Sequence, residues 1–271
     1  MAEQAAGGVI LEARGVTARF GAFTAVDDAS YTLREGETAG IIGPNGAGKS
    51  TLFNLMTGLV PAAAGSIHFS GEDVTGRAAH QRVRRGLVRT FQLVSVFEPL
   101  SALDNLVLAA IRAEPALARG ARFLLGGARR PALARACSAA LERVGLGAKA
   151  ELPAAELSYG DKRMLEIALA LALRPRVLLL DEPFAGLSDV EIAEVLELVK
   201  KLRGTISIVI IEHKLSHLVG LVSRLSVMHG GRFITEGKPA DVLGDAAVRR
   251  VYWGREGRSL VEDGTGRGAG S

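Results

Sequence analysis

Short apolar runs alternate with amphipathic segments in the second half of the chain. Three runs have the length of buried strands: VLLLD (177–181), ISIVII (206–211) and LSVMH (225–229). Helical patterns precede them over 158–173, over 189–202 and from 214. Strands that alternate with helices of this length predict a parallel α/β sheet. The run TAGII (38–42) predicts one more buried strand, which leads into a Gly-rich loop.

The first half has a different texture. Segments 9–20 and 24–33 are short, partly alternating and bounded by turn residues, which is typical of strands, and 66–74 resembles a strand pair around a turn. Between about 93 and 157 the chain is rich in Ala, Leu and Arg, and Gly and Pro divide it into several helices, so we expect a helical insert. We expect one domain over 1–253 and a disordered tail over 254–271, where six of eighteen residues are Gly.

Composition narrows the class of protein. The chain is 48% hydrophobic and 23% charged, as ordinary globular proteins are. Cys137 is the single cysteine, so neither an intrachain disulfide nor a cysteine-cluster metal site can form. A spanning helix needs about 20 apolar residues. The run 205–211 is only seven residues long, and 164–173 is interrupted by Glu166, so no membrane span is predicted.

Charge is unevenly distributed. Residues 77–143 contain twelve Arg, no Lys and four acidic residues, a net charge of +8, whereas the chain as a whole carries +4. Such a block indicates an anionic partner, either nucleic acid or a membrane surface, or else a solvated face. Aromatic residues make up only 5% of the chain and do not interleave with the Arg residues, which disfavours a single-strand nucleic-acid platform.

The sequence GPNGAGKST (43–51) matches the pattern G-x-x-x-x-G-K-[ST] between a strand and a helical segment. Its glycines permit close backbone approach, and its N–H groups and the helix start form a nest for anions. Lys49 can reach the β- and γ-phosphates, and the Ser50 hydroxyl can bind Mg²⁺. The alternative is a Gly-rich turn with an incidental Lys, which the flanking elements disfavour. The predicted phosphate-binding residues are Gly43, Pro44, Asn45, Gly46, Ala47, Gly48, Lys49, Ser50 and Thr51.

Two acidic residues follow the strand 177–180 at the end where parallel sheets bind ligands. Asp181 is placed to hold Mg²⁺, and Glu182 to orient and deprotonate an attacking water. Solvation or capping of the next helix would explain the pair alone, but the phosphate loop favours the catalytic interpretation. A GTPase would carry an Asn-Lys-x-Asp segment, and no Asn-Lys pair occurs here. A small-molecule kinase would need an acceptor site that the sequence does not locate.

From about residue 9 to 253 the chain resembles the ATP-binding subunits of ABC transporters. The ordered motifs that carry the resemblance are GPNGAGKST (43–51, Walker A), RTFQ (89–92, Q-loop), LSYGDKR (157–163, signature), LLLDEP (178–183, Walker B), AGLS (185–188, D-loop) and IIEHK (210–214, H-switch). The resemblance implies an α/β P-loop ATPase core with an N-terminal antiparallel β subdomain and an inserted helical subdomain. The implied cofactors are ATP and Mg²⁺.

The resemblance also assigns roles to single residues. Gln92 and His213 join Glu182 as catalytic residues, and Gln92 joins Ser50 and Asp181 around Mg²⁺. Phe20 stands where the family places an aromatic ring that stacks on adenine, although an isolated aromatic residue is also typical of core packing.

The signature residues Ser158, Tyr159 and Gly160 are implied to clamp the ATP of an opposite ATPase subunit. From the residues alone, Ser158 can equally be a helix N-cap with Asp161 completing a variant capping box, and the two roles are compatible. Tyr159 and Asp161 depart from the common Leu-Ser-Gly-Gly-Gln signature, and Ser188 stands where the D-loop commonly has Asp. A carboxylate at 161 would repel a γ-phosphate unless it is turned away.

The motif sequences and the ending EGKPADVLGDAAVRRVYWG (236–254) resemble the larger ATPase subunit of branched-chain amino acid importers, whose relatives serve urea, amides and aromatic acids. This implies a peripheral protein at the cytoplasmic face of the inner membrane. The implied partners are a second ATPase subunit (in a homodimer or heterodimer), two integral membrane permease subunits and an extracytoplasmic solute-binding protein. No nucleic acid is expected. The alternative is a soluble ABC-type ATPase without a membrane partner.

Overall fold

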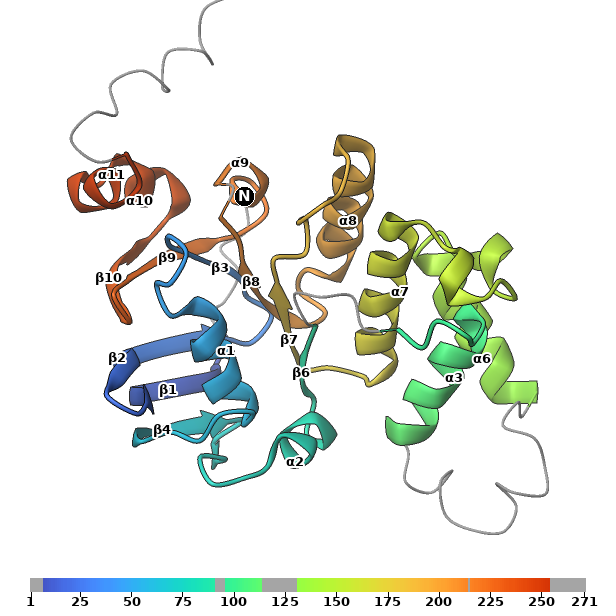
Figure 1. The fold of residues 1–271 in the computed structure, drawn as a ribbon, viewed down its shortest axis with the longest axis horizontal. Coiled ribbons are helices and arrows are strands. Elements are labelled where there is room, and N and C mark those ends of the chain that lie inside the picture. Colours follow the sequence, from blue (N-terminus) through green and yellow to red (C-terminus); the bar gives the residue numbers. More distant parts are fainter. Residues whose placement is uncertain (1–6, 91–95, 114–130, 214, 254–271) are drawn as a thin grey trace, which may run out of the picture.

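Two sheets organise the molecule, for which a computed structural model describes residues 7–90, 96–113, 131–213 and 215–253 (Figure 1). The first is antiparallel, in the order β2-β1-β4-β5. Its strands are β1 (Val9–Phe20), β2 (Phe23–Arg34), β4 (Ala64–Phe69) and β5 (Glu72–Asp73). The second has the order β10-β9-β3-β8-β7-β6. Its strands are β3 (Thr38–Ile42), β6 (Leu87–Arg89), β7 (Val177–Asp181), β8 (Ser207–Ile211), β9 (Arg224–His229) and β10 (Arg232–Gly237).

The second sheet is parallel from β9 to β6, and only β10 runs antiparallel, beside β9. Every residue of β3, β7 and β8 is buried. Alternate residues of β7 enter two different cores: Val177 and Leu179 face one, Leu178 and Leu180 the other. Helices therefore cover both faces, which explains why these strands read as continuous apolar runs in the sequence.

Helix α1 (Lys49–Thr57) packs between the two sheets. Its buried side chains Leu52, Phe53, Leu55 and Met56 share one core with the inner face of the antiparallel sheet and with Leu179 and Val209 of the parallel sheet. Gly48 precedes the helix as its N-cap and Gly58 follows it as its C-cap, and both residues have left-handed backbone conformations. The antiparallel sheet thus fixes the helix that follows the Gly-rich loop.

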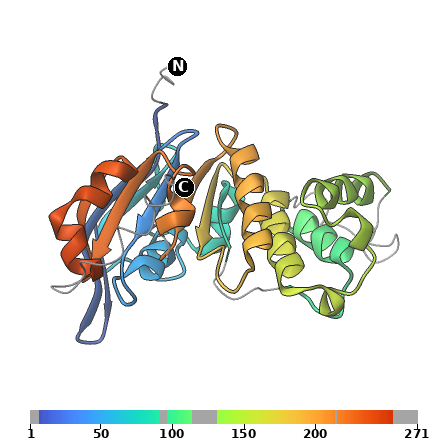
Figure 2. The ribbon, with the colours of Figure 1, turned by 90° about the horizontal axis from the view of Figure 1, so that it is seen from above.

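The opposite face of the parallel sheet carries α7 (Tyr159–Ala172) and α8 (Asp189–Leu202), whose apolar residues share a core with α3 (Ala102–Ala113) and α6 (Pro131–Arg143). Helices α3 and α6 project beyond the sheet as a separate lobe, with short 3-10 turns at Gly147–Lys149 and Ala154–Glu156 (Figure 2). Near the C-terminus, α10 (Pro239–Gly244) and α11 (Ala246–Trp253) lie against β10.

The predicted fold class is confirmed: a parallel α/β core, an antiparallel β subdomain and a helical lobe. The predicted helix from residue 214 is short, with α9 limited to Leu215–Leu218. Sequence patterns did not predict β6, which has three residues, or α2 (Ala79–Arg84). The predicted tail 254–271 lies outside the described residues, and the domain limits stay a prediction. Within the described ranges, no helix has the length and apolar character that crossing a membrane requires.

Arg82, in the basic block, is a structural residue. Its side chain is fully buried, and the guanidinium donates hydrogen bonds to the carbonyl oxygens of Leu55, Met56, Thr75 and Arg77 at 2.7–2.9 Å. Two of these acceptors, Leu55 and Met56, lie in the last turn of α1, where helix carbonyls have few backbone donors. Both interpretations of the basic block 77–143, an anion-binding surface and a solvated face, are therefore wrong at Arg82.

Replacing Arg82 by Ala should lower the free energy of unfolding by about 3 kcal/mol, because buried carbonyl groups lose their donors and a cavity remains. Urea unfolding measures the change. Arg84→Ala, on the exposed side of the same helix, is the matched control and should cost less than about 0.5 kcal/mol. Equal stability of the two variants would contradict the structural role of Arg82.

Candidate functional site

The loop 43–48 packs tightly against two neighbouring strands at two glycines, where a side chain would have no room. A Cβ on Gly43 would lie 2.3 Å from the Met228 carbonyl oxygen. Gly48 has φ +100°, and its Cβ would lie 2.5 Å from the Ala25 carbonyl oxygen. The loop is thus held against β9 and β2, and it leads into the N-terminus of α1, where backbone N–H groups are free of helical acceptors.

A cleft of about 470 Å³ opens above this helix start. The loop and α1 line it with Asn45, Gly46, Ala47, Gly48, Lys49, Ser50 and Thr51, and the other lining residues are Phe23, Ala25, Glu182 and His213. The structure therefore brings together seven of the nine predicted phosphate-binding residues and two of the three predicted catalytic residues. Gly43 and Pro44 form the back of the loop, where their carbonyl oxygens face Lys49.

Lys49 is buried, and its ammonium donates hydrogen bonds to the carbonyl oxygens of Gly43 at 2.7 Å and Pro44 at 3.0 Å. Burial holds the pKa of Lys49 below its usual value, against the opposing effect of the carboxylates of Glu182 and Asp181. The loop thus holds a desolvated cation at its centre, and a desolvated cation attracts a polyphosphate more strongly than a solvated one does.

Register aligns the strand ends that carry the acidic residues. Asp181, the last residue of β7, pairs with Ile211, the last residue of β8, and the backbone N–H of Glu182 donates to the Ile211 carbonyl at 2.9 Å. Glu182 has φ +47°, in the left-handed region that a side chain rarely adopts. A strained backbone of this kind persists only where the surrounding structure holds it in place, and it is common at functional sites. Glu182 lines the cleft together with Lys49, and the two charges interact.

Glu212 is a buried carboxylate that sequence reasoning did not single out. It accepts hydrogen bonds from the backbone N–H of Phe184 at 3.2 Å and of His213 at 3.1 Å. It also lies 3.6 Å from the Nδ1 atom of His213. Glu212 therefore fixes the segments after β7 and β8 relative to each other and sets where His213 enters the cleft. Its place beside His213, after an apolar strand, was the available signal.

Ser50 and Asp181 are suited to a magnesium ion. The Ser50 hydroxyl lies 3.4 Å from Oδ1 of Asp181, so two hard oxygen donors lie side by side where α1 begins and β7 ends. Mg²⁺ typically takes one or two carboxylates and completes its shell with water and substrate phosphates. Among the residues that the structure describes, no cluster of three or more His, Cys, Asp or Glu side chains could hold a metal without such help.

Two of the predicted site residues, Gln92 and Phe20, are not among the described residues that line the cleft. Gln92 lies outside the described residues. Phe20 is half exposed at the tip of the β1–β2 hairpin and is not among the described residues that line the cleft. Its cross-strand neighbour Phe23, which is 64% exposed, does line the cleft. A role for Phe20 in stacking on adenine stays a prediction, and Phe23 is the aromatic residue that sequence reasoning missed.

The signature residues begin α7, away from the cleft. Ser158 caps the helix: its hydroxyl accepts from the Asp161 backbone N–H, and the Asp161 carboxylate accepts from the Ser158 backbone N–H, so the predicted capping box is confirmed. Ser188 caps α8 in the same way with Glu191. The Gly160 N–H donates to the Glu191 carboxylate, which leaves no space for a Cβ at 160. The helix start thus already holds an anionic group.

Asp161 stays at the start of α7, where a neighbouring cation pairs with its charge. Both of its carboxylate oxygens accept hydrogen bonds from the Lys149 ammonium, at 2.6 and 2.8 Å. Burial would raise the pKa of Asp161, but the bonds from Lys149 and Ser158 outweigh burial and hold the pKa below its usual value. Its negative charge is therefore paired, and the expected repulsion of a phosphate is offset.

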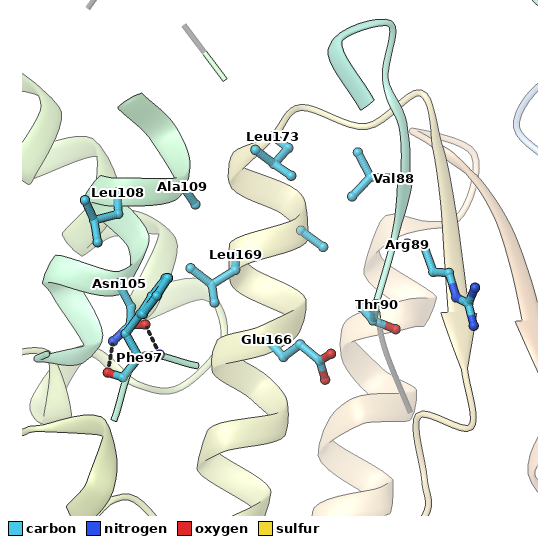
Figure 3. A pocket seen from close by; sticks show the side chains of 11 residues that line it. Val88, Arg89, Thr90, Phe97, Asn105, Leu108, Ala109, Glu166, Leu169 and Leu173 are labelled. Atoms are coloured by element: carbon cyan, nitrogen blue, oxygen red, sulfur yellow. Dashed lines mark hydrogen bonds between the residues drawn. The ribbon is translucent and has the colours of Figure 1, made fainter. Parts of the chain in front are cut away.

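A second cleft, of about 440 Å³, lies between the helical lobe and the sheet. Leu108 and Phe97 line it from the lobe side, Leu169 and Leu173 from α7 and Val88 from β6 (Figure 3). Asn105 shapes one wall by exchanging hydrogen bonds with the Phe97 backbone at 2.8 and 3.0 Å. Its lining is largely apolar, so it differs in kind from the polar cleft at the phosphate loop.

The Gly-rich loop, the buried Lys and the acidic residues after a parallel strand define a P-loop nucleoside triphosphatase. Residues 26–185 match the family described as "ABC transporter". The chain belongs to this family and is an ATP-binding protein that couples ATP hydrolysis to transport.

Curated relatives are similar over nearly their whole length. The chain is 36% identical to the high-affinity branched-chain amino acid transport ATP-binding protein BraF of Pseudomonas aeruginosa and 37% identical to the corresponding LivG of Salmonella typhimurium. Each alignment covers 90% of this chain and 98% of the relative. A crystal structure of an ABC transporter ATP-binding cassette in its ADP conformation matches with a TM-score of 0.80 and 30% identity, over 90% of this chain and 98% of that one.

Lys149→Met should destabilise the protein at neutral pH by about 1 kcal/mol or less, the usual size for a partly exposed ion pair. Because the pKa of Asp161 is lower in the folded protein than in the unfolded chain, the stabilisation exists above about pH 3.9 and is lost as pH falls through the lowered value. Thermal unfolding at decreasing pH should show a constant difference down to about pH 3.9 and a shrinking difference below it. A difference that stays constant below that pH, or one that Lys201→Met reproduces, would contradict the ion pair's role.

Proposed function

We propose that this chain is the ATP-hydrolysing subunit of an importer for branched-chain amino acids or a related small polar solute. The single observation that carries the proposal is the convergence of Lys49, Glu182 and His213 on one polar cleft at the carboxyl ends of β3, β7 and β8. The cargo is supported by the names of the relatives, whose ATP-binding proteins serve branched-chain amino acid transport.

In the proposed mechanism, the loop 43–51 cradles the β- and γ-phosphates, with Lys49 as the central cation. Glu182 orients a water molecule on the γ-phosphate and accepts its proton, and His213 contacts the same phosphate. Ser50, Asp181 and Gln92 would hold Mg²⁺, which when bound neutralises charge on the phosphate oxygens. Phe20 and Phe23 at the hairpin tip are the candidates for stacking on adenine.

A second copy of the cassette, or a sibling ATPase, completes the proposed enzyme. Ser158, Tyr159 and Gly160 start a capped helix whose N–H groups suit the γ-phosphate bound by the opposite subunit. The Glu191 carboxylate at Gly160 would have to withdraw when that phosphate arrives. The isolated chain should therefore hydrolyse ATP poorly.

The apolar cleft beside α3 and α7 supports a membrane partner. It is open, largely apolar and adjoins the helical lobe, so it suits a loop of an integral membrane subunit. We assign two permease subunits, an extracytoplasmic solute-binding protein and a peripheral location at the cytoplasmic face of the inner membrane on this basis and on the family resemblance. The alternative, a soluble ABC-type ATPase without a membrane partner, leaves this cleft without an occupant.

Glu182→Gln should keep ATP binding and lower turnover by at least about 100-fold, because the base is lost while the phosphate cradle stays. The assay uses the protein recovered from membranes with its integral subunits. Glu194→Gln, an exposed change on α8, is the control and should leave turnover unchanged. Near-normal hydrolysis by Glu182→Gln would refute the role of Glu182, and recovery of the native protein only from soluble fractions would favour the alternative.

A further inference from the structure

Arg89 is a buried cation that the proposed mechanism does not use. It ends β6 on the edge of the parallel sheet, where it pairs with Leu179 of β7. Its side chain is 7% exposed. Figure 3 shows its guanidinium pointing away from the apolar cleft, toward the strands of the sheet. The charge of Arg89 is therefore directed into the protein rather than toward a partner.

Residues of α1 and β7 in the described part of the chain contact this guanidinium. One nitrogen, Nη2, donates to Oδ2 of Asp181 at 2.6 Å. Another, Nη1, donates to Oδ1 of Asn54 on α1 at 2.5 Å. The guanidinium also lies over the ring of Phe53, 5.5 Å from its centroid. Arg89 thus ties the strand end that carries Asp181 to the helix that follows the phosphate loop.

The bond to Arg89 divides the Asp181 carboxylate between two partners. Oδ2 faces Arg89, and Oδ1 faces the Ser50 hydroxyl at 3.4 Å. Asp181 is 1% exposed, so no bulk solvent is available to hold either oxygen in place. The guanidinium is planar, and Asn54 and Asp181 each hold one of its two terminal nitrogens. It can therefore fix the rotation of the Asp181 carboxylate, which a cation with a single nitrogen cannot do equally well.

We propose that Arg89 is a positioning residue for the magnesium site: it holds Oδ2 of Asp181 so that Oδ1 is presented beside Ser50. The inference rests on the proposed function, in which Ser50 and Asp181 hold Mg²⁺. Groups that orient a metal's ligands typically contribute a factor of 10 to 100 in metal affinity. Arg89 contacts Asp181 and α1 rather than the phosphate loop. Loss of Arg89 should therefore weaken binding of the Mg²⁺–nucleotide complex and not of the nucleotide without metal.

The test measures binding of a fluorescent, non-hydrolysable ATP analogue at equilibrium, once with saturating Mg²⁺ and once in EDTA. In the wild-type protein, Mg²⁺ should strengthen binding. In Arg89→Met, this gain should fall about tenfold, whereas affinity in EDTA should stay within about twofold. Arg176→Met removes an exposed Arg at the start of the neighbouring strand and should leave both values unchanged.

If Arg89→Met does not fold, Arg89→Lys replaces it in the test. This variant keeps a buried positive charge and should therefore keep the fold. One ammonium cannot reproduce the fork between Asp181 and Asn54, so the gain from Mg²⁺ should still fall several-fold. An unchanged or larger gain in Arg89→Lys or Arg89→Met overturns the positioning role, and so does an equal loss of affinity with and without Mg²⁺. If the wild-type protein shows no gain from Mg²⁺, the proposed magnesium site fails, and this inference fails with it.

Discussion

The pairing of β3, β8 and β7 at their carboxyl ends is the constraint on which the site depends. These strands are buried on both faces, so their register is held by two cores at once, and a slip would move apolar side chains of both sets. Because the register is fixed, Glu182, Glu212 and the phosphate loop emerge at one edge. The strained backbone at Glu182 is stable only in such a frame.

Beyond the strand pairing of the parallel sheet, buried charged side chains also link neighbouring elements. Arg82 ties α1 to the turn after the antiparallel sheet, and Arg89 ties β6 to α1 and β7. Within α7, Arg163 and Glu166 form a buried pair at 2.7 Å beneath the helical lobe. Burying such groups costs free energy unless hydrogen bonds compensate, and each of these groups has them. The basic block of the sequence is thus partly internal scaffolding, which changes the meaning of its net charge.

The sequence predicted most of the fold because its strongest signals are local. Continuous apolar runs gave β3, β7 and β8, and Ser158 with Asp161 gave the start of α7. The loop 43–51 and Glu182 followed from motif and strand context. Long-range partners were not predictable: neither the burial of Arg82 nor the contact of Lys149 with Asp161 has a sequence pattern. Phe23 was missed because hairpin geometry, not residue type, decides which aromatic residue faces the cleft.

The central claim is that the loop around Lys49 is the nucleotide site and that its buried ammonium is the main cation for the phosphates. The most direct test is equilibrium binding of ATP in EDTA to the wild-type protein and to Lys49→Ala, because the metal then makes no contribution. The account predicts that Lys49→Ala weakens binding by at least about tenfold while the fold, followed by circular dichroism, is unchanged; a lost charge-assisted bond of 1.5–3 kcal/mol corresponds to that factor or more. Equal affinity in the two proteins would contradict it.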